Sequence, residues 1–98
     1  MTSERARAYG QVTRTLGDLG PATLLPTEQA RIREAADAMV FSRDLGTDRA
    51  ARSAFSGVCE LAEHLVATNR WSGRRAERLI EDIWSCGPGA EDWLAIAA

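Results

Sequence analysis

The chain has 98 residues, of which 45% are hydrophobic and 27% are charged, and its twelve basic and fourteen acidic side chains give a net charge of −2. This length allows one domain with its own core, and this composition excludes a wholly disordered chain. The slight acidic excess disfavours a dedicated nucleic-acid-binding protein, which usually has a basic surplus. All twelve basic residues are arginine, which we interpret as the codon bias of a GC-rich genome; selection for bidentate pairing is the alternative.

No stretch of the sequence predicts a membrane segment or a secretory signal. A membrane-spanning helix needs about eighteen or more consecutive apolar residues, and no run in this chain approaches that length. The N-terminal residues do not lead into the apolar core of a secretory signal. We therefore expect a single helical domain over 1–98, located in the cytoplasm.

The first predicted helix covers 4–18. Apolar residues within it and just after it recur at steps of three and four, which places them on one face of a helix; they are Tyr9, Val12, Leu16 and Leu19. The dipeptide Gly20-Pro21 is typical of a helix end, and a short linker follows it. Within this linker, Leu24 and Leu25 are expected to tuck under the other helices.

The second predicted helix covers 27–43. Thr27 is its expected N-cap, and Glu28 lies in the first turn, where a negative charge is favourable. The apolar face consists of Ile32, Ala35, Ala36, Met39 and Val40. Phe41 lies about 180° away from the start of this face. It either packs under the turn at Leu45 or anchors a partner or a second subunit, since aromatic anchors dominate protein interfaces.

The third and fourth predicted helices cover 48–68 and 72–86. Thr47-Asp48 is expected to open the third helix with a cap, and Ser72 is the expected N-cap of the fourth. The fourth helix ends at Gly87, which a proline follows. The apolar face of the third helix consists of Ala51, Ala54, Phe55, Val58, Ala62, Leu65 and Val66. The apolar face of the fourth consists of Ala76, Leu79, Ile80, Ile83 and Trp84.

These segments predict an all-α fold, a small four-helix bundle. Each apolar face must be buried against another element, and the other faces are the available partners. We expect 27–43, 48–68 and 72–86 to form an antiparallel core, closed on one side by 4–18. Residues 88–98 follow as a separate tail or a short helix.

An arginine cluster lies at the start of the last predicted helix; it consists of Arg70, Arg74, Arg75 and Arg78, with Trp71 among them. Basic residues are unfavourable at this end of a helix because the macrodipole is positive there. Together with free backbone N–H groups, the cluster suits a phosphate or an acidic partner. The alternative is a solvated face whose arginines pair with acids inside the fold, such as Arg78 with Asp82.

The segment 61–65, a turn and the segment 74–80 resemble a bacterial helix-turn-helix DNA-binding motif with an arginine-bearing recognition helix. This resemblance implies a DNA-binding protein that contacts duplex through Arg74, Arg75 and Arg78. The turn between the two segments is longer than the three or four residues usual in that motif. The acidic composition also opposes this alternative.

Glu60, Glu63 and His64 have a spacing that occurs in di-iron helix bundles. Their positions on the predicted helix direct them to solvent, whereas metal ligands in bundles project inward. The chain has one histidine, so it contains no His-dependent triad, and no phosphate loop or nucleophile motif is present. Cys59 and Cys86 lack metal-ligand spacing and are expected to be reduced thiols. We expect no metal, no cofactor and no enzymatic activity.

The C-terminal residues have two interpretations. Ala97, Ala98 and the free carboxylate, preceded by Ile96 in place of leucine, resemble the Leu-Ala-Ala ending of the tag that bacteria add to stalled peptides for unfolding by a AAA+ protease. The segment would then be a degradation signal or docking peptide. In the interpretation we favour, Trp93, Leu94 and Ile96 fold back as a cover over the bundle, because an exposed tryptophan is costly.

The function expected from the sequence is that of a small, intracellular, non-enzymatic helical module for protein interaction or regulation. Its partner is another protein or a second copy in a homodimer. The expected contact surfaces are 70–78 and the region around Phe41. DNA binding is the alternative, and small-ligand binding inside the bundle would require a cavity.

Overall fold

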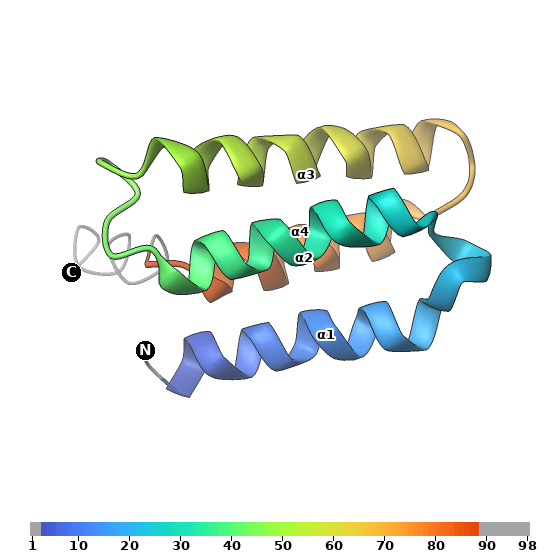
Figure 1. Cartoon of the computed structure of the whole chain (residues 1–98). Helices are drawn as coiled ribbons and strands as arrows, with labels where there is room; N and C mark the ends of the chain where they lie inside the picture. The colour runs from blue at the N-terminus through green and yellow to red at the C-terminus, as the bar shows by residue number, and fades with distance from the viewer. Residues whose placement is uncertain (1–2, 89–98) are drawn as a thin grey trace.

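The computed structural model describes residues 3–88, and for residues 20–23 the backbone alone. Its helices are α1 (Ser3–Thr23), α2 (Pro26–Phe41), α3 (Arg49–Ala67) and α4 (Gly73–Cys86). Consecutive helices run in opposite directions (Figure 1). No strand occurs in the part of the chain that the structure describes. The predicted all-α four-helix bundle is therefore confirmed.

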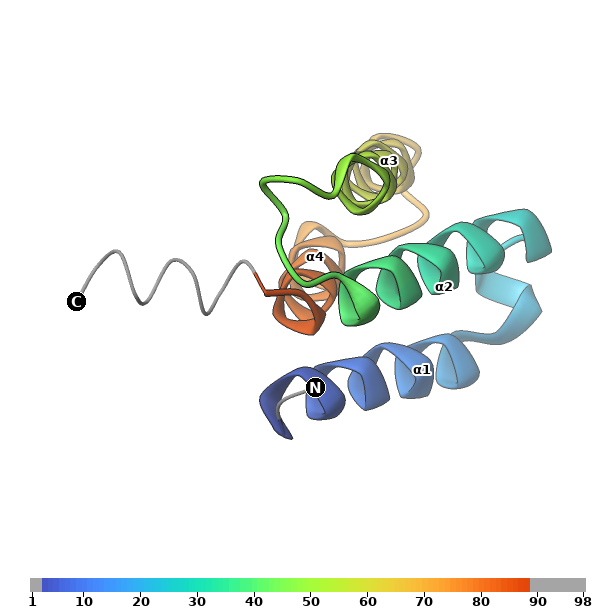
Figure 2. The same ribbon diagram turned by 60° about the vertical axis from the view of Figure 1, so that its left-hand side comes forward.

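The helices α2 and α4 cross the middle of the bundle, and α1 and α3 lie on either side of them. Both α1 and α3 pack against α2 and α4, whereas α1 and α3 make no contact with each other within the described chain. In Figure 2, α3 is seen nearly end-on while α1 and α2 run across the view, so α3 is inclined to the α1–α2 pair. Because α1 buries Ala8, Val12 and Leu16, it is part of the core and not only a cover on one side.

The core consists of the apolar faces that helical spacing predicts. The most completely buried side chains are Val12, Leu24, Ile32, Met39, Val58, Leu65, Ile83 and Cys86. Burial of one large aliphatic side chain contributes about 1.5–3 kcal/mol, so these contacts hold the helices together. Phe55 and Ile80 depart from the pattern because they are only partly buried, and Trp84 keeps 38% of its surface exposed.

The N-terminal cap predicted for α2 is wrong and that of α4 is confirmed; at Thr47-Asp48, the predicted start of α3, the N-cap is Asp48. α2 begins at Pro26 and Leu25 is its N-cap, since proline lacks the N–H that the first helical position leaves unpaired and its fixed φ suits that position. Thr27 therefore lies inside the first turn. The Oδ1 atom of Asp48 accepts the N–H of Ala51 at 3.0 Å. In the same way, the Oγ atom of Ser72 accepts a backbone N–H from the first turn of α4.

The α1–α2 connection is shorter than predicted, because α1 continues through Gly20 and Pro21 to Thr23. A proline removes one helical hydrogen bond, here the bond to the carbonyl of Gly17. Gly17 is exposed, so water can hydrate that carbonyl. The last turn of α1 rises toward α2 in Figure 1. Leu24 is buried as expected, but the prediction for Leu25 is wrong, since 55% of its surface is exposed.

The α3–α4 turn depends on Asn69, whose φ of 60° lies in the left-handed region. Asparagine tolerates this conformation better than most residues. It allows the N–H of Arg70 to reach the carbonyl of Leu65 at 2.9 Å, and the N–H of Trp71 to reach the same oxygen at 3.1 Å. The turn therefore satisfies a carbonyl at the end of α3 and reverses the chain toward α4.

The guanidinium group of Arg5 fastens α1 to the C-terminal ends of α2 and α4. Its Nε donates to the carbonyl of Cys86 at 2.8 Å. Its Nη2 lies 2.8 Å from the carbonyl oxygens of Met39 and Ser42, and 2.9 Å from that of Val40. A positive charge is favourable at a helix C-terminus because unpaired carbonyls and the macrodipole are negative there. Arg5 serves two such ends at once.

A second polar contact connects α1 to α2. The hydroxyl of Tyr9 donates to Oδ1 of Asp37 at 2.6 Å. This hydrogen bond to a carboxylate is the main reason why the pKa of Tyr9 is raised above its usual value, and partial burial is the second reason. The side of the bundle that carries α1 is therefore fixed by directional contacts as well as by apolar packing.

Candidate functional site

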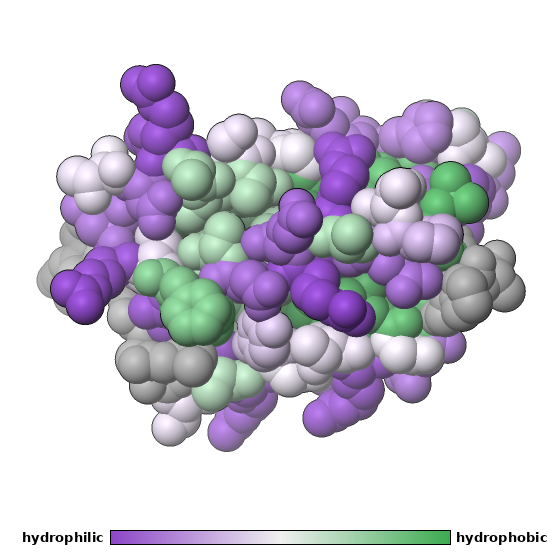
Figure 3. Space-filling view, in the orientation of Figure 1, coloured by the Kyte–Doolittle hydropathy of each residue, from purple (hydrophilic) through white to green (hydrophobic). Residues whose placement is uncertain are grey.

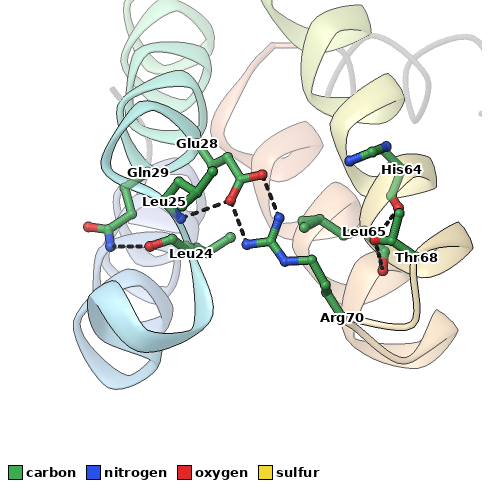
Figure 4. A network of polar contacts seen from close by, with 8 residues as sticks. All are labelled: Leu24, Leu25, Glu28, Gln29, His64, Leu65, Thr68 and Arg70. Carbon is green, nitrogen blue, oxygen red and sulfur yellow. Dashed lines mark hydrogen bonds and ion pairs between the residues drawn. The ribbon is translucent and has the colours of Figure 1, made fainter.

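The structure separates Arg70 from the other predicted arginines. Arg70 Nη1 donates to Glu28 Oε2 at 2.9 Å and Nη2 donates to Oε1 at 2.8 Å. Glu28 Oε1 also accepts the N–H of Leu25 at 2.8 Å, so its carboxylate connects the two loops at one end of the bundle (Figure 4). The pairing with Arg70 lowers the pKa of the Glu28 carboxyl, although burial alone would raise it. Arg70 has a structural role here.

Trp71 is also absent from the surface. Only 4% of its area is exposed, and it belongs to the core cluster. The guanidinium carbon of Arg75 lies 6.0 Å from the centroid of its ring, within the range of a cation–π contact. Trp71 therefore supports the start of α4 and does not present its ring to a partner.

Arg74, Arg75 and Arg78 remain exposed on α4. Their guanidinium groups form no ion pair with a carboxylate among the described residues, so the expected internal pair between Arg78 and Asp82 is not formed. They line a cleft of about 380 Å³ between α1 and α4. Asp82 and Asp18 line the same cleft, so its charge is mixed.

Phe41 lies at the end of α2 with 80% of its surface exposed. The interpretation that it packs under the turn at Leu45 is therefore wrong. The face of the molecule in Figure 3 has separate hydrophobic patches interrupted by hydrophilic side chains. An exposed phenylalanine is compatible with an anchor role, but a single exposed apolar residue is ordinary on a protein surface.

The residues considered for metal binding and thiol chemistry lie as the sequence predicts. Glu60, Glu63 and His64 are exposed, and within 3–88 no three His, Cys, Asp or Glu side chains are grouped to hold a metal ion. The two cysteines are free thiols. Burial raises the pKa of Cys86 to about 11, which keeps it protonated and unreactive at neutral pH. The described helices include none that is long and apolar enough to cross a membrane.

A surface that sequence analysis missed lies where α3 meets α4. It is an open groove of about 630 Å³, defined here as the α3–α4 groove. Its apolar lining consists of Ala62, Val66, Ala67, Gly73, Ala76 and Ile80. The side chains of Val66 and Ile80 are only partly buried, because α2 covers the opposite side of this helix pair. The bundle thus leaves part of two apolar faces in contact with water.

An aromatic pair adds to the apolar surface of the same two helices. The rings of Phe55 on α3 and Trp84 on α4 have their centroids 5.3 Å apart and are tilted by 53°. This arrangement is within the preferred range for aromatic pairs. Helical spacing places Phe55, Ala62 and Val66 on one side of α3. Apolar surface therefore extends beyond the α3–α4 groove along both helices.

Acidic side chains border the α3–α4 groove on both helices. Glu63 comes from α3, and Glu77 and Glu81 come from α4. All three are exposed. Among the described residues that line the groove, none is basic and none is a serine, cysteine or histidine. The groove therefore offers an apolar floor with negatively charged edges, and it lacks the groups of a nucleophilic catalyst.

The sequence contained a partial signal for this groove. The apolar face of α3 includes Phe55 and Val66 as well as Val58 and Leu65, and all four lie within an arc of about 100°, the usual width of such a face. Helical spacing shows which residues share a face, but it does not show how much of that face a neighbouring helix covers. The groove is visible only after the four helices are assembled.

The predicted docking or degradation segment cannot be placed in this architecture. Trp93, Ile96, Ala97 and Ala98 lie outside the described residues. Both interpretations of the C-terminal segment therefore stay predictions.

Comparison of the chain with models of protein families, with curated proteins and with solved structures finds no match.

Proposed function

We propose that the protein is a non-enzymatic interaction module that binds a helix of another protein in the α3–α4 groove. The observation that carries this proposal is the open groove between α3 and α4, whose floor is apolar and whose residues Val66 and Ile80 stay only partly buried. An apolar surface with charged residues along its rim is the arrangement expected of a site for protein interaction.

The composition of the groove supports binding by shape and apolar contact. Val66 and Ile80 have apolar area that a partner would remove from water, at about 25 cal/mol per Å². Outside the groove, on the same two helices, Trp84 keeps 38% of its surface exposed, and it is a residue type that contributes strongly to binding energy at interfaces. The groove between two helices also has the form that receives an amphipathic helix in known recognition modes.

The proposal places the protein inside the cell. Cys59 and Cys86 are both free, and thiols persist in reducing compartments. The partner surface differs from the surfaces expected from sequence, because Arg70 and Trp71 are used within the fold. Phe41 remains a candidate for a secondary contact.

DNA binding by α4 is a second candidate function, favoured by one observation. Arg74, Arg75 and Arg78 are exposed and have no ion-pair partner among the described carboxylates. Two features oppose it: α4 packs against the three other helices, and Glu77 and Glu81 alternate with the arginines on its exposed face. These carboxylates would face phosphates in a DNA groove.

A duplex-binding titration distinguishes the two candidates. If α4 binds DNA, the chain has a strongly salt-dependent affinity for duplex that the double variant Arg74→Ala/Arg75→Ala loses. We expect no such affinity for duplex in the native chain or in the double variant. Fluorescence anisotropy of a labelled duplex at two salt concentrations measures this directly.

Site-specific crosslinking tests the proposed function in the cell. A photoreactive amino acid at Val66 should crosslink to a second polypeptide, because this position lines the α3–α4 groove. The matched control places the same amino acid at Ser53, which is exposed on the other side of α3. The additional substitution Ile80→Glu should abolish the crosslink from Val66.

Two results would contradict the proposal: no crosslink from Val66, or equal crosslinking from Ser53. Because Ile80 is only partly buried, the variant Ile80→Glu is expected to fold. Thermal unfolding followed by circular dichroism checks that it does.

A further inference from the structure

The exposed side chains of α4 are sorted by charge around the helix. On the side that faces α3, Ile80 lines the α3–α4 groove together with Glu77 and Glu81. The same two glutamates border a shallow surface depression with Arg74 and Arg78. These arginines in turn line the cleft beside α1. An acidic strip therefore separates the apolar groove from the basic strip of the same helix.

We propose that the occupant of the α3–α4 groove is an amphipathic helix whose apolar face is flanked by lysine or arginine residues. This inference rests on the proposed function and adds the charge of the partner to it. The two glutamates of α4 and Glu63 of α3 stand on opposite walls of the groove. A helix lying along the groove would therefore meet carboxylates on both sides of its apolar face.

The carboxylates select between partners more than they add affinity. In the free protein they are exposed and hydrated. A docked helix removes part of that water, so a facing acidic residue is repelled more strongly and a facing basic residue is attracted more strongly. Like charges brought together in this way are a recognised means of rejecting wrong partners.

The same charges disfavour a second copy of this chain as the occupant. In a symmetric dimer the same surface patch meets itself. Glu63, Glu77 and Glu81 of one copy would then approach the same residues of the other across a surface that contains no basic side chain among its described lining residues.

The C-terminal segment of the chain is a poor occupant for the same reason. Residues 89–98 contain Glu91 and Asp92 next to Trp93, and they contain no basic residue. This segment would bring two further negative charges to an acidic groove.

The floor of the groove favours an occupant with larger apolar side chains. Ala62, Ala76 and Gly73 are small and line it, and no atom lies within 4 Å of the position that a Cβ at Gly73 would take. Leucine-sized side chains of a partner helix can therefore approach the α3 and α4 backbones closely. The proposed partner is therefore a helix with a row of large apolar side chains between two rows of basic residues.

Selection from a peptide library tests the inference on the full chain. The library displays helical peptides with a fixed leucine ridge at i, i+3, i+4 and i+7 and with random residues at the flanking positions. We expect the recovered peptides to be enriched in lysine and arginine at the flanks. Their affinity should fall at least tenfold in Ile80→Glu, which places a charge in the groove.

Charge reversal provides the matched comparison. The double variant Glu77→Lys/Glu81→Lys should weaken the basic peptides at least tenfold. The control Glu34→Lys/Glu60→Lys makes the same change of net charge at exposed glutamates outside the groove, and it should change affinity less than twofold. Both variants alter exposed side chains only, so both are expected to fold.

The outcomes separate this inference from the proposed function. Recovered peptides with neutral or acidic flanks whose binding still depends on Ile80 would overturn the charge inference and leave the proposed function intact. Recovery of no peptide that depends on Ile80 would overturn both.

Two further outcomes would identify a different occupant. A dimer in light scattering that Ile80→Glu dissociates would assign the groove to a second copy. A tenfold gain in peptide affinity on the substitution Trp93→Asp would assign it to the C-terminal segment. Either result overturns the inference.

Discussion

The two sides of α4 are built differently. On the side of α1, polar contacts with defined geometry supplement the core: Arg5 binds carbonyl groups at the ends of α2 and α4, and Tyr9 binds Asp37. On the side of α3, α4 meets α3 through apolar residues, and Ile80 and Trp84 remain in contact with water. The polar contact that holds α3 is made with α2, where Arg31 donates to the carbonyl of Gly57 at 2.8 Å. The cleft on the α1 side is lined largely by polar and charged side chains, whereas the groove on the α3 side has an apolar floor. That apolar floor is what we assign to partner binding.

The largest expected effect compares two isoleucines of α4, one buried in the core and one lining the α3–α4 groove. Ile83 is fully buried, so Ile83→Ala should lower the free energy of unfolding by about 3–4 kcal/mol through lost burial and a cavity. Ile80 is only partly buried, and Ile80→Ala should cost about 1 kcal/mol. Urea unfolding of both variants measures the difference. Equal losses would mean that the α3–α4 groove is closed.

The second prediction concerns the polar fastening of α1. Arg5→Ala should lower the free energy of unfolding by about 2–3 kcal/mol, because carbonyls at two helix ends lose a charged donor. Arg5→Lys should recover only part of this loss, since lysine keeps the charge but not the planar fork. Arg7→Ala is the control, because Arg7 is exposed, and it should stay within about 0.5 kcal/mol. A loss for Arg5→Ala as small as the control would show that α1 is held by apolar packing alone.

The third prediction concerns the pH dependence of the Glu28–Arg70 pair. The pKa of Glu28 is lowered in the folded chain relative to its ordinary value of 4.5. A lowered carboxyl pKa stabilises the folded state above 4.5, and this stabilisation is lost as the pH falls through the folded pKa. Glu28→Gln should therefore cost about 1–2 kcal/mol at pH 7.

The cost of Glu28→Gln should shrink as the pH falls below 4.5. Denaturant unfolding of the native chain and this variant across that range gives the comparison. A difference that stays constant with pH would contradict the assigned cause of the pKa shift.

The smallest expected effects come from two glycines and have opposite signs. A Cβ at Gly87 would lie 2.5 Å from Cε of the buried Met39, so Gly87→Ala should cost about 1 kcal/mol. Gly17 lies in α1 with no atom within 4 Å of a Cβ position, so Gly17→Ala should stabilise by about 0.8 kcal/mol. Melting temperatures of the two variants should move in opposite directions, and a shift of the same sign would refute the packing described at Gly87.

Local signals in the sequence predicted most of the fold. Helical spacing located the four helices, and the caps at Thr47-Asp48 and Ser72 were located correctly because a cap depends on residues within one turn. The errors near Pro21 and Thr27 have a physical reason: a proline can occupy the end or the first position of a helix as well as break it.

The site was harder to predict because it depends on contacts distant in sequence. Glu28 and Arg70 are separated by 42 residues, and no local pattern connects them. The sequence therefore assigned Arg70 to a surface cluster, whereas in the structure Arg70 forms a contact between two loops. In the same way, Val66 and Ile80 belonged to apolar faces whose coverage becomes known only when α2 is placed.

The central claim is that the α3–α4 groove holds a partner helix, and filling the groove tests it most directly. Ala67 is exposed and lines the groove, whereas Ala50 is exposed on the same helix outside it. The measurement is the affinity of the polypeptide crosslinked at Val66 for the variants Ala67→Trp and Ala50→Trp. The account predicts at least a tenfold loss for Ala67→Trp and no change for Ala50→Trp. Unchanged affinity in Ala67→Trp would contradict it.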